Sequence, residues 1–308
     1  MPKAADNDRP LVSTVIAVRN DADGLAHTLA ALSAQTLPSD RFEVIVVDDA
    51  STDATAAVAR SHTGVRLVRL PAVQGSYVAR NRGLDAARGV VIAITDADCR
   101  PEPHWLERGA ARIGADPSAV VGGHISMPLN GNRTLAAMVD VVNHLDQERY
   151  VDEGCAVTAN LFAAADTFRA VGGFDERLQS SGDVEWTRRA VSAGHPLVYA
   201  PDTVVVHPPR TSARALLGKA RRTAEGMRVA NRRRLLDTRR PYFDYRVLVP
   251  SHRDRWPVRL RENGVRPGRI GLLALGVGQV ALVQLPHVLY ALAADVRVWA
   301  GMDVGRDD

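Results

Sequence analysis

Two carboxylates one residue apart, Asp96 and Asp98, are the residues of this sequence whose types and spacing best suit catalysis. They belong to the tetrapeptide TDAD, which continues an apolar run. Carboxylates at positions i and i+2 can share a hard divalent cation, either both directly or one of them through water. Such a cation keeps open positions for phosphate oxygens and stabilises the charge on a leaving phosphate. The tripeptide D-x-D alone is common in surface loops, so its significance depends on the residues around it.

Alternating strands and helices over the first hundred residues would position these carboxylates. Short β-branched runs predict buried strands, and apolar residues at helical spacing predict helices between them. The predicted strands are Val12–Val18, Phe42–Val47, Val65–Leu70 and Val90–Thr95, and the predicted helices are Asp21–Leu37, Ser51–Ala59 and Val78–Ala87. This alternation is typical of right-handed βαβ units, and it indicates an α/β fold with a mostly parallel sheet covered by helices on both faces.

The carboxyl ends of the parallel strands are where we expect a ligand, because side chains there leave the hydrogen-bonded ladder and face a crevice. Asp49 follows the second predicted strand, and Asp96 and Asp98 follow the fourth. All three are therefore expected at one edge of the sheet. A helix-capping role is an alternative for Asp49, but a strand end requires neither Asp96 nor Asp98.

The next hundred residues mix the two kinds of element. We expect a strand over Gly122–Met127, an irregular helix over Leu135–Tyr150, an extended segment over Cys155–Phe162, helices over Asp166–Val171 and Val184–Ala193, and a strand over Leu197–Val206. The two prolines that follow, Pro208 and Pro209, end this part of the chain.

Five motifs in order make the sequence resemble the family 2 glycosyltransferases over residues 11–210. They are VIVVDDASTD (Val44–Asp53), GSYVARNRGLDAARG (Gly75–Gly89), TDADC (Thr95–Cys99), TANLFAAADTFRAVGGFDERL (Thr158–Leu178) and SGDVEWTRRA (Ser181–Ala190). The resemblance implies a GT-A fold and a metal-dependent inverting transfer. The sugar would move from a nucleotide-diphospho-sugar, expected to be UDP-linked, to a hydroxyl acceptor, with Mg²⁺ or Mn²⁺ as cofactor.

The resemblance also implies roles for residues on the donor side. Asp49 matches a nucleobase-binding aspartate, and Asp96 and Asp98 match the DXD metal motif, with Asp98 as the direct ligand. Arg80 and Asn81 match a basic and polar pair near the diphosphate, although a solvated helix face is the alternative for them.

On the acceptor side, Asp183 matches the carboxylate that the family uses as general base. An inverting transfer needs such a base opposite the diphosphate, to take the proton as the hydroxyl attacks. An N-cap role is the alternative, because Asp183 stands just before a predicted helix. Many relatives have Glu-Asp here, whereas this chain has Gly182 before Asp183, which leaves open how the base is oriented.

Two further residues have both a functional and a structural interpretation. Trp186 lies three residues after Asp183 and would share its helix face, where it could be a platform for an acceptor sugar or simply pack in the core. His207, at the end of a predicted strand, resembles a further metal ligand of some relatives, with a purely structural role as the alternative.

Charge divides the 308 residues, whose net charge is only +4, into unequal parts. Residues 1–209 carry 19 basic and 26 acidic side chains, whereas residues 210–240 carry 11 and 2. We therefore expect a catalytic domain over 1–209, with a nucleotide-sugar half at about 11–100 and an acceptor half at about 101–209. Residues 210–308 would form a basic helical segment and an apolar tail. The average composition excludes a disordered, a collagen-like and a polytopic membrane protein.

The tail suggests contact with a membrane. The basic segment 210–240 contains no aromatic residue, which argues against nucleic acid and favours anionic lipid headgroups. Residues 270–294 carry no formal charge and could span a bilayer, lie in its plane or pack on the catalytic domain. With no apolar segment near Met1 and too few cysteines for a disulfide framework, we expect a cytoplasmic protein at the inner face of the cell membrane.

These observations favour an enzyme of cell-envelope polysaccharide or glycolipid synthesis, with a glycan or lipid-linked acceptor. A non-catalytic nucleotide-sugar-binding module is one alternative, to which the glycine at position 182 would point. A sugar-phosphate nucleotidyltransferase is another, although the glycine-rich basic signature of such enzymes is missing after the first predicted strand.

Overall fold

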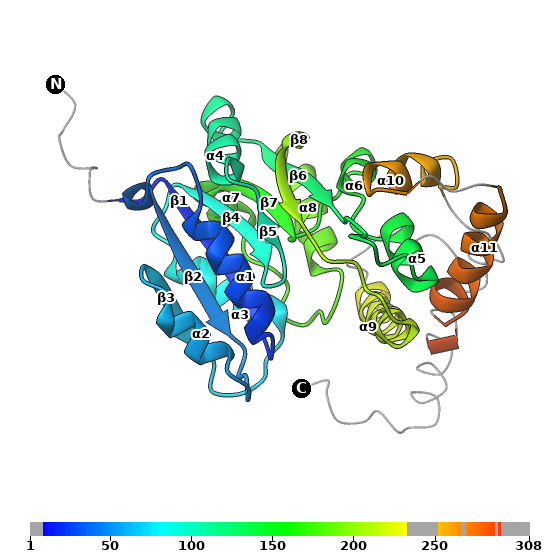
Figure 1. Cartoon of the computed structure of the whole chain (residues 1–308). Helices are drawn as coiled ribbons and strands as arrows, with labels where there is room; N and C mark the ends of the chain where they lie inside the picture. Colours follow the sequence, from blue (N-terminus) through cyan, green and yellow to red (C-terminus); the bar gives the residue numbers. More distant parts are fainter. Residues whose placement is uncertain (1–8, 233–251, 266–268, 287–288, 291–308) are drawn as a thin grey trace. The chain divides into compact units, whose positions relative to one another are not determined.

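An eight-stranded sheet organises the computed structural model, which describes residues 9–232, 252–265, 269–286 and 289–290 (Figure 1). The strand order is β3-β2-β1-β4-β7-β6-β8-β5. The strands are β1 (Val12–Val18), β2 (Phe42–Asp48), β3 (Val65–Arg69), β4 (Val91–Asp96), β5 (Arg100–Pro101), β6 (Val120–Ser126), β7 (Asn160–Ala164) and β8 (Leu197–Val206).

The first half of the sheet is parallel, as the βαβ pattern predicted. β1 lies between β2 and β4, with Val12 opposite Phe42 on one side and Val91 on the other. Helix α3 (Ser76–Ala86) packs on β1 and β2, while α1 (Ala22–Ser33) packs with α2 (Thr55–Ser61). The α/β prediction with helices on both faces is confirmed.

The second half of the sheet is mixed. β7 is antiparallel to both β4 and β6, β8 is parallel to β6, and the short β5 is antiparallel to β8. The apolar pattern indicated a strand near Phe162, but it carried no information on direction, because a strand buried on both faces presents the same residues in either sense. Helix α4 (Trp105–Ala115) packs against β8, and α7 (Ala165–Val171) against β7.

Side-chain contacts mark the starts of two helices, and one predicted helix is divided in two. The Asp21 carboxylate caps α1 by accepting from the Gly24 N–H, and Asp53 accepts from the N–H of Thr55, so α2 begins there rather than at Ser51. The predicted helix over 135–150 is two helices, α5 (Leu135–Asn143) and α6 (Gln147–Asp152). It breaks at Leu145, whose φ is 57°.

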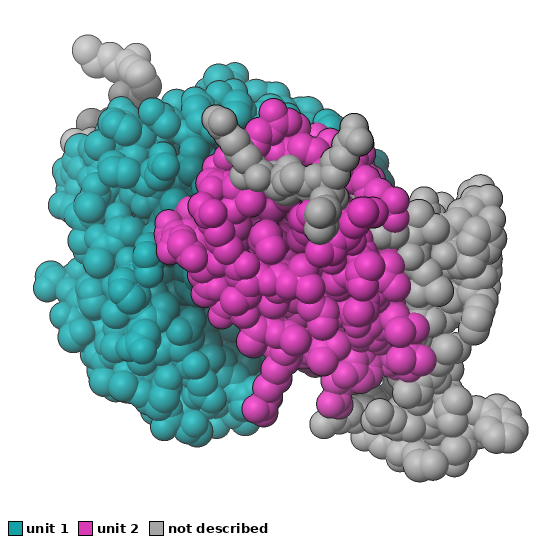
Figure 2. Space-filling model, turned by 45° about the vertical axis from the view of Figure 1, so that its right-hand side comes forward, with its two compact units in different colours: residues 1–126, 145–177, 182–208 teal, residues 127–144, 178–181, 209–308 magenta. Residues whose placement is uncertain are grey.

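The chain divides into two compact units, coloured separately in Figure 2. Unit 1 comprises residues 1–126, 145–177 and 182–208, and unit 2 comprises 127–144, 178–181 and 209–308. Two internal segments thus group with the C-terminal residues. The predicted division into a catalytic domain and a tail at residue 209 stays a prediction.

Unit 2 has its own apolar core. It contains α5, α9 (Ala213–Arg232), α10 (Trp256–Glu262), α11 (Arg269–Gln279) and the π-helical turn η3 (Val280–Gln284). Trp256, Leu260 and Leu275 are buried together with residues of α5. Asp140 of α5, fully buried, accepts from the backbone N–H of Arg210 at 2.8 Å and pairs with the ring of His144 at 2.7 Å. Burial lowers the pKa of His144 to about 4.

The apolar stretch over residues 270–294 lies only partly in the described chain. Its first part forms α11 and η3, whereas residues 287–288 and 291–294 fall outside. In the part of the chain that the structure describes, no helix is both long and apolar enough to cross a membrane.

Candidate functional site

The carboxyl end of β4 brings together four side chains that could hold a metal ion. Asp96 is the last residue of β4, and Asp98 and Cys99 lie in the turn that follows. Because Arg100 of β5 pairs with Val206 of β8, His207 comes next to this turn. One potential ligand atom from each of Asp96, Asp98, Cys99 and His207 lies within 4.8 Å of the others.

The turn that carries Asp98 is held from α1. The Thr28 hydroxyl is within hydrogen-bonding distance of the carbonyl oxygens of Ala97 (2.6 Å) and Cys99 (2.5 Å). The Thr95 hydroxyl donates to the carbonyl of Ala159 at 2.9 Å. These buried contacts fix the backbone on both sides of Asp98, so the carboxylates are presented by a rigid element.

The donor set fits a hard divalent cation. The Asp98 carboxylate lies 3.5 Å from Nε2 of His207. Nδ1 of His207 lies 2.8 Å from the carbonyl of Pro208; since a carbonyl only accepts, Nδ1 carries the proton and leaves the Nε2 lone pair for a metal. Burial, with the charges of Asp96 and Asp98, raises the pKa of the Cys99 thiol well above its ordinary value. A thiol is a soft ligand, whereas two carboxylates and an imidazole suit a hard cation such as Mg²⁺ or Mn²⁺.

Arg80 of α3 reaches the same place from the other side. Its guanidinium donates to Asp96 at 2.7 Å and lies over the Tyr77 ring, 5.5 Å from the centroid. The side chain is only 9% exposed, and its Nε has no hydrogen-bond partner. The structure therefore places Arg80 inside the site rather than on a solvated helix face, with a buried donor to spare.

Asp183 lies at the start of helix α8 (Gly182–Ser192). Its carboxylate accepts from the N–H of Val184 at 3.0 Å and from the Tyr77 hydroxyl at 3.3 Å. Burial raises the pKa of Asp183, the charge of Arg80 opposes this shift, and the charge of Asp96 adds to it. A carboxylate with a raised pKa is a stronger base once ionised.

Asp49 leaves β2 at the edge where Asp96 leaves β4. Both strands run parallel to β1, and Val18 and Ala17 of β1 pair with Asp48 and Asp96 respectively. Asp49 is 4% exposed, and its carboxylate accepts from the backbone N–H groups of Gln74 at 2.7 Å and Gly75 at 2.9 Å. Asp49 therefore ties the loop before α3 to this edge, with lone pairs left on each oxygen.

Two predicted site residues make structural contacts instead. The Asn81 amide accepts from the backbone N–H of Phe174 and donates to its carbonyl and to Glu176. Trp186 is fully buried, stacks on Phe168 at 4.3 Å, and its Nε1 donates to the carbonyl of Gly172. A ring without exposed surface offers no platform to a sugar, so packing, which the sequence left open, is the role seen here for Trp186.

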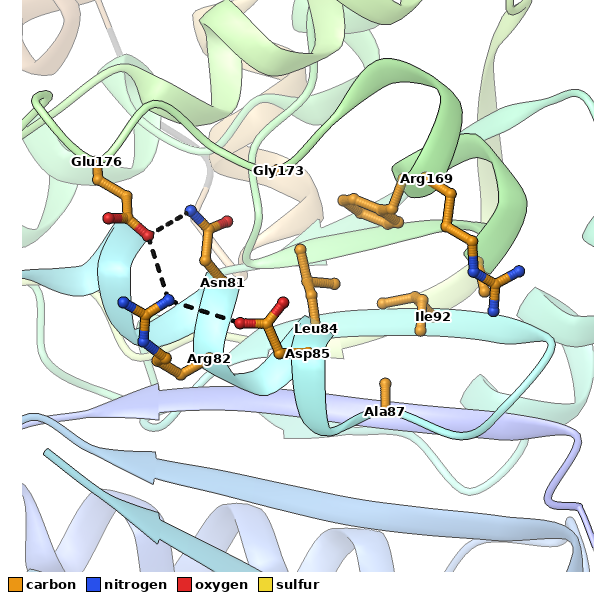
Figure 3. Close-up of a pocket in the computed structure, with 11 residues that line it drawn as sticks. Asn81, Arg82, Leu84, Asp85, Ala87, Ile92, Arg169, Gly173 and Glu176 are labelled. Atoms are coloured by element: carbon orange, nitrogen blue, oxygen red, sulfur yellow. Dashed lines mark hydrogen bonds and ion pairs between the residues drawn. The ribbon is translucent and has the colours of Figure 1, made fainter.

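A cavity of about 560 Å³ lies elsewhere in unit 1 (Figure 3). Its lining includes Leu84, Ile92 and Phe168, with Arg82 and Glu176 on one wall. Ile92 stands near the start of β4, so the cavity is about 13 Å along the strand from Asp96. Of the predicted site residues only Asn81 lines it, so the cavity is separate from the group of carboxylates.

Two residues that lie at the site were not predicted. Tyr77 lies inside the motif Gly75–Gly89, but the sequence does not indicate that its hydroxyl would contact Asp183. Cys99 directly follows the DXD tripeptide, and this position in the sequence could have indicated that it lies near the two carboxylates.

Comparisons with known proteins identify relatives of this chain. The profile of glycosyl transferase family 2 matches residues 13–154. Over 222 residues the chain is 36% identical to the glycosyltransferase AglE of Haloferax volcanii, covering 70% of this chain and 73% of that protein. Over 213 residues it is 32% identical to the pre-mycofactocin glycosyltransferase of Mycobacterium tuberculosis, covering 66% of this chain but only 44% of that protein.

Solved structures share the fold at lower sequence identity. The mannosyltransferase PcManGT from Pyrobaculum calidifontis, in complex with GDP-Man and Mn²⁺, superposes with a TM-score of 0.59 at 22% identity over 95% of this chain and 88% of that one. TarS of S. aureus superposes with a TM-score of 0.53 at 17% identity over 92% of this chain and 55% of that one.

Proposed function

Because the chain belongs to the family 2 glycosyltransferases and has their GT-A fold, we propose that it is a metal-dependent inverting enzyme. It transfers a sugar from a nucleotide-diphospho-sugar to a hydroxyl group of the acceptor. The observation that carries this proposal is the convergence of Asp96, Asp98 and His207 within 4.8 Å, with Arg80 bound to Asp96 at 2.7 Å. A leaving diphosphate is stabilised by positive charge, which Arg80 and a cation held by these carboxylates would supply.

Asp96, Asp98 and His207 would hold Mg²⁺ or Mn²⁺, which when bound neutralises charge on the leaving diphosphate. Arg80 supplies a further positive charge there, and its unpartnered Nε is a donor that a phosphate oxygen would satisfy. Binding of the diphosphate also compensates the buried charge of Arg80.

Asp183 acts as the general base. Its carboxylate takes the proton of the acceptor hydroxyl while that oxygen attacks the anomeric carbon. The bond from this carbon to the diphosphate oxygen breaks in the same step, and the nucleoside diphosphate leaves with the electron pair. A single in-line displacement inverts the anomeric configuration and needs no covalent sugar–enzyme intermediate.

Asp49 would contact the nucleoside, and we propose a UDP-linked donor. The buried carboxylate of Asp49 accepts two backbone N–H groups and keeps further lone pairs for a nucleobase N–H or a ribose hydroxyl. The fold relative PcManGT carries GDP-Man, so GDP-linked sugars are the natural comparison.

A panel of nucleotide sugars tests the donor proposal. With Mn²⁺ present, we expect one UDP-sugar at a hundred times its Kd to stabilise the protein by about 2.7 kcal/mol, because it binds only the folded state. The measurement is the melting temperature, followed by donor hydrolysis or transfer with the sugar that binds. A shift with GDP-sugars alone would overturn the UDP assignment. Binding without turnover with any acceptor would favour the non-catalytic module instead.

We further propose a glycan or lipid-linked acceptor of the cell envelope and an anionic membrane surface at its inner face as partner of residues 210–300. Leu273 and Val277, one helical turn apart on α11, are 72% and 71% exposed, and Leu285 and Leu289 are exposed apolar residues as well. Exposed arginines such as Arg214 stand on α9. Exposed apolar and basic side chains in one unit suit the interface of an anionic bilayer.

Vesicle co-sedimentation checks this partner. We expect the protein to bind vesicles with anionic lipid, and Leu273→Asn with Val277→Asn to weaken binding roughly ten-fold, since burial of apolar area drives insertion. Val73→Asn, at a 50% exposed apolar residue of unit 1, is the matched control. Equal binding of both variants, or no preference for anionic over neutral vesicles, would contradict the proposal.

A further inference from the structure

The glycine at position 182 has a steric cause in this structure. A β-carbon built on Gly182 would lie 2.8 Å from both Cε2 and Cζ of Tyr77, closer than real β-carbons approach other atoms. Gly182 is not among the residues with positive φ, so its backbone conformation does not itself require glycine. The space beside the backbone of residue 182 is filled by a side chain from another helix.

That side chain is held firmly. Tyr77 is 5% exposed, and its ring packs against Phe174 at 5.7 Å. Its position on α3, three residues before Arg80, puts both side chains on one helix face. Tyr77 thus reaches Asp183 while Arg80 reaches Asp96.

We propose that Tyr77 is a positioning residue for Asp183, orienting the carboxylate through its hydroxyl from the space that a side chain at position 182 would otherwise use. The inference rests on the proposed role of Asp183 as general base. It gives Gly182 a function, because only a residue without a side chain leaves room for the tyrosine ring. The glycine therefore accompanies an alternative way of holding the base and is no sign of lost catalysis.

The surroundings of Asp183 predict what removal of the hydroxyl does. The groups that act on this carboxylate are Tyr77 and Arg80 of α3, Asp96 of β4, Cys155, and the N–H groups of its own helix start and of Thr158. A hydroxyl that donates to the charged form stabilises it. Loss of this donor raises the pKa of Asp183, and the acid limb of the pH–rate profile moves to higher pH, since catalysis requires the ionised form.

Tyr77→Phe tests the proposal, because it removes the hydroxyl and keeps the ring. We expect kcat to fall roughly ten-fold, as for a lost hydrogen bond to a charged group, with the donor KM unchanged and the acid limb moved upward. Tyr199→Phe is the matched control, because its hydroxyl lies 2.7 Å from Nδ1 of His124, away from the proposed base.

Wild-type kcat and an unmoved acid limb in Tyr77→Phe, with Asp183→Asn inactive, would overturn the positioning role alone. Full activity of Asp183→Asn would instead overturn the proposed base itself, so the two failures are distinguishable.

A double-mutant cycle adds a steric test. Gly182→Ala should displace the ring and lower kcat as Tyr77→Phe does, with the same movement of the acid limb. Because both changes act through one hydroxyl, the double variant should be no slower than either single variant. If the fold-losses in kcat of the two single variants multiply in the double variant, the link between Gly182 and Tyr77 is overturned. Melting temperatures show whether each variant is folded.

Discussion

Asp183→Asn is expected to lower kcat by about a thousand-fold, the middle of the range for loss of a general base, while donor affinity stays as in the wild type. The amide keeps the shape of the carboxylate and can still accept from Val184 and Tyr77, but it cannot take a proton. Single-turnover rates with a saturating donor measure the effect, and calorimetry with the donor and Mn²⁺ measures the affinity.

The stability of this variant separates catalysis from folding. Because the pKa of Asp183 is raised in the folded protein, folding favours its protonated form, and that contribution is present at low pH and lost as pH rises through the folded pKa. At neutral pH the neutral asparagine should therefore leave the melting temperature no lower than in the wild type. Asp202→Asn, at an exposed carboxylate paired with Arg112, is the control. Wild-type turnover in Asp183→Asn would exclude it as the base.

Asp98→Asn is expected to weaken Mn²⁺ binding and to lower kcat/KM by at least about a hundred-fold, because a metal ion contributes several kcal/mol of charge stabilisation in such a transfer. The carboxylate lies 3.5 Å from Nε2 of His207, and an amide binds a divalent cation less strongly. Titration of Mn²⁺, followed by paramagnetic resonance, reports binding without any turnover.

An exposed pair in the same unit provides the control for the metal site. His104 and Glu107 lie 3.1 Å apart and resemble the His207–Asp98 pair in chemistry, but no further carboxylate joins them in a group of the described residues. Glu107→Gln should leave Mn²⁺ affinity unchanged. Unaltered affinity in Asp98→Asn, or lost affinity in Cys99→Ser, would reassign the ligands, since a soft thiol is not an expected ligand of Mn²⁺.

The sequence alone determined the parallel half of the sheet and the edge at which its carboxylates gather. Alternation of short β-branched runs with helical spacing is a local property, and it puts Asp49 and Asp96 at the ends of strands on either side of β1. The motifs that contain these residues also contribute to the resemblance to the family. The prediction of strands and helices used only neighbouring residues, whereas the resemblance to the family used motifs spread over residues 44–190.

Only the tertiary structure decided which distant side chains meet these carboxylates. The resemblance suggested His207 as a metal ligand, with a structural role as the alternative, and the pairing of β5 with the end of β8 is what brings it to Asp98. Tyr77 meets Asp183 because α3 and α8 pack so that a ring fills the space beside Gly182. Helix packing likewise directs Asn81 to the backbone of Phe174 and Trp186 to the ring of Phe168. Periodicity reports which face of an element is apolar, whereas strand pairing and helix packing depend on contacts between segments whose partners no local pattern names.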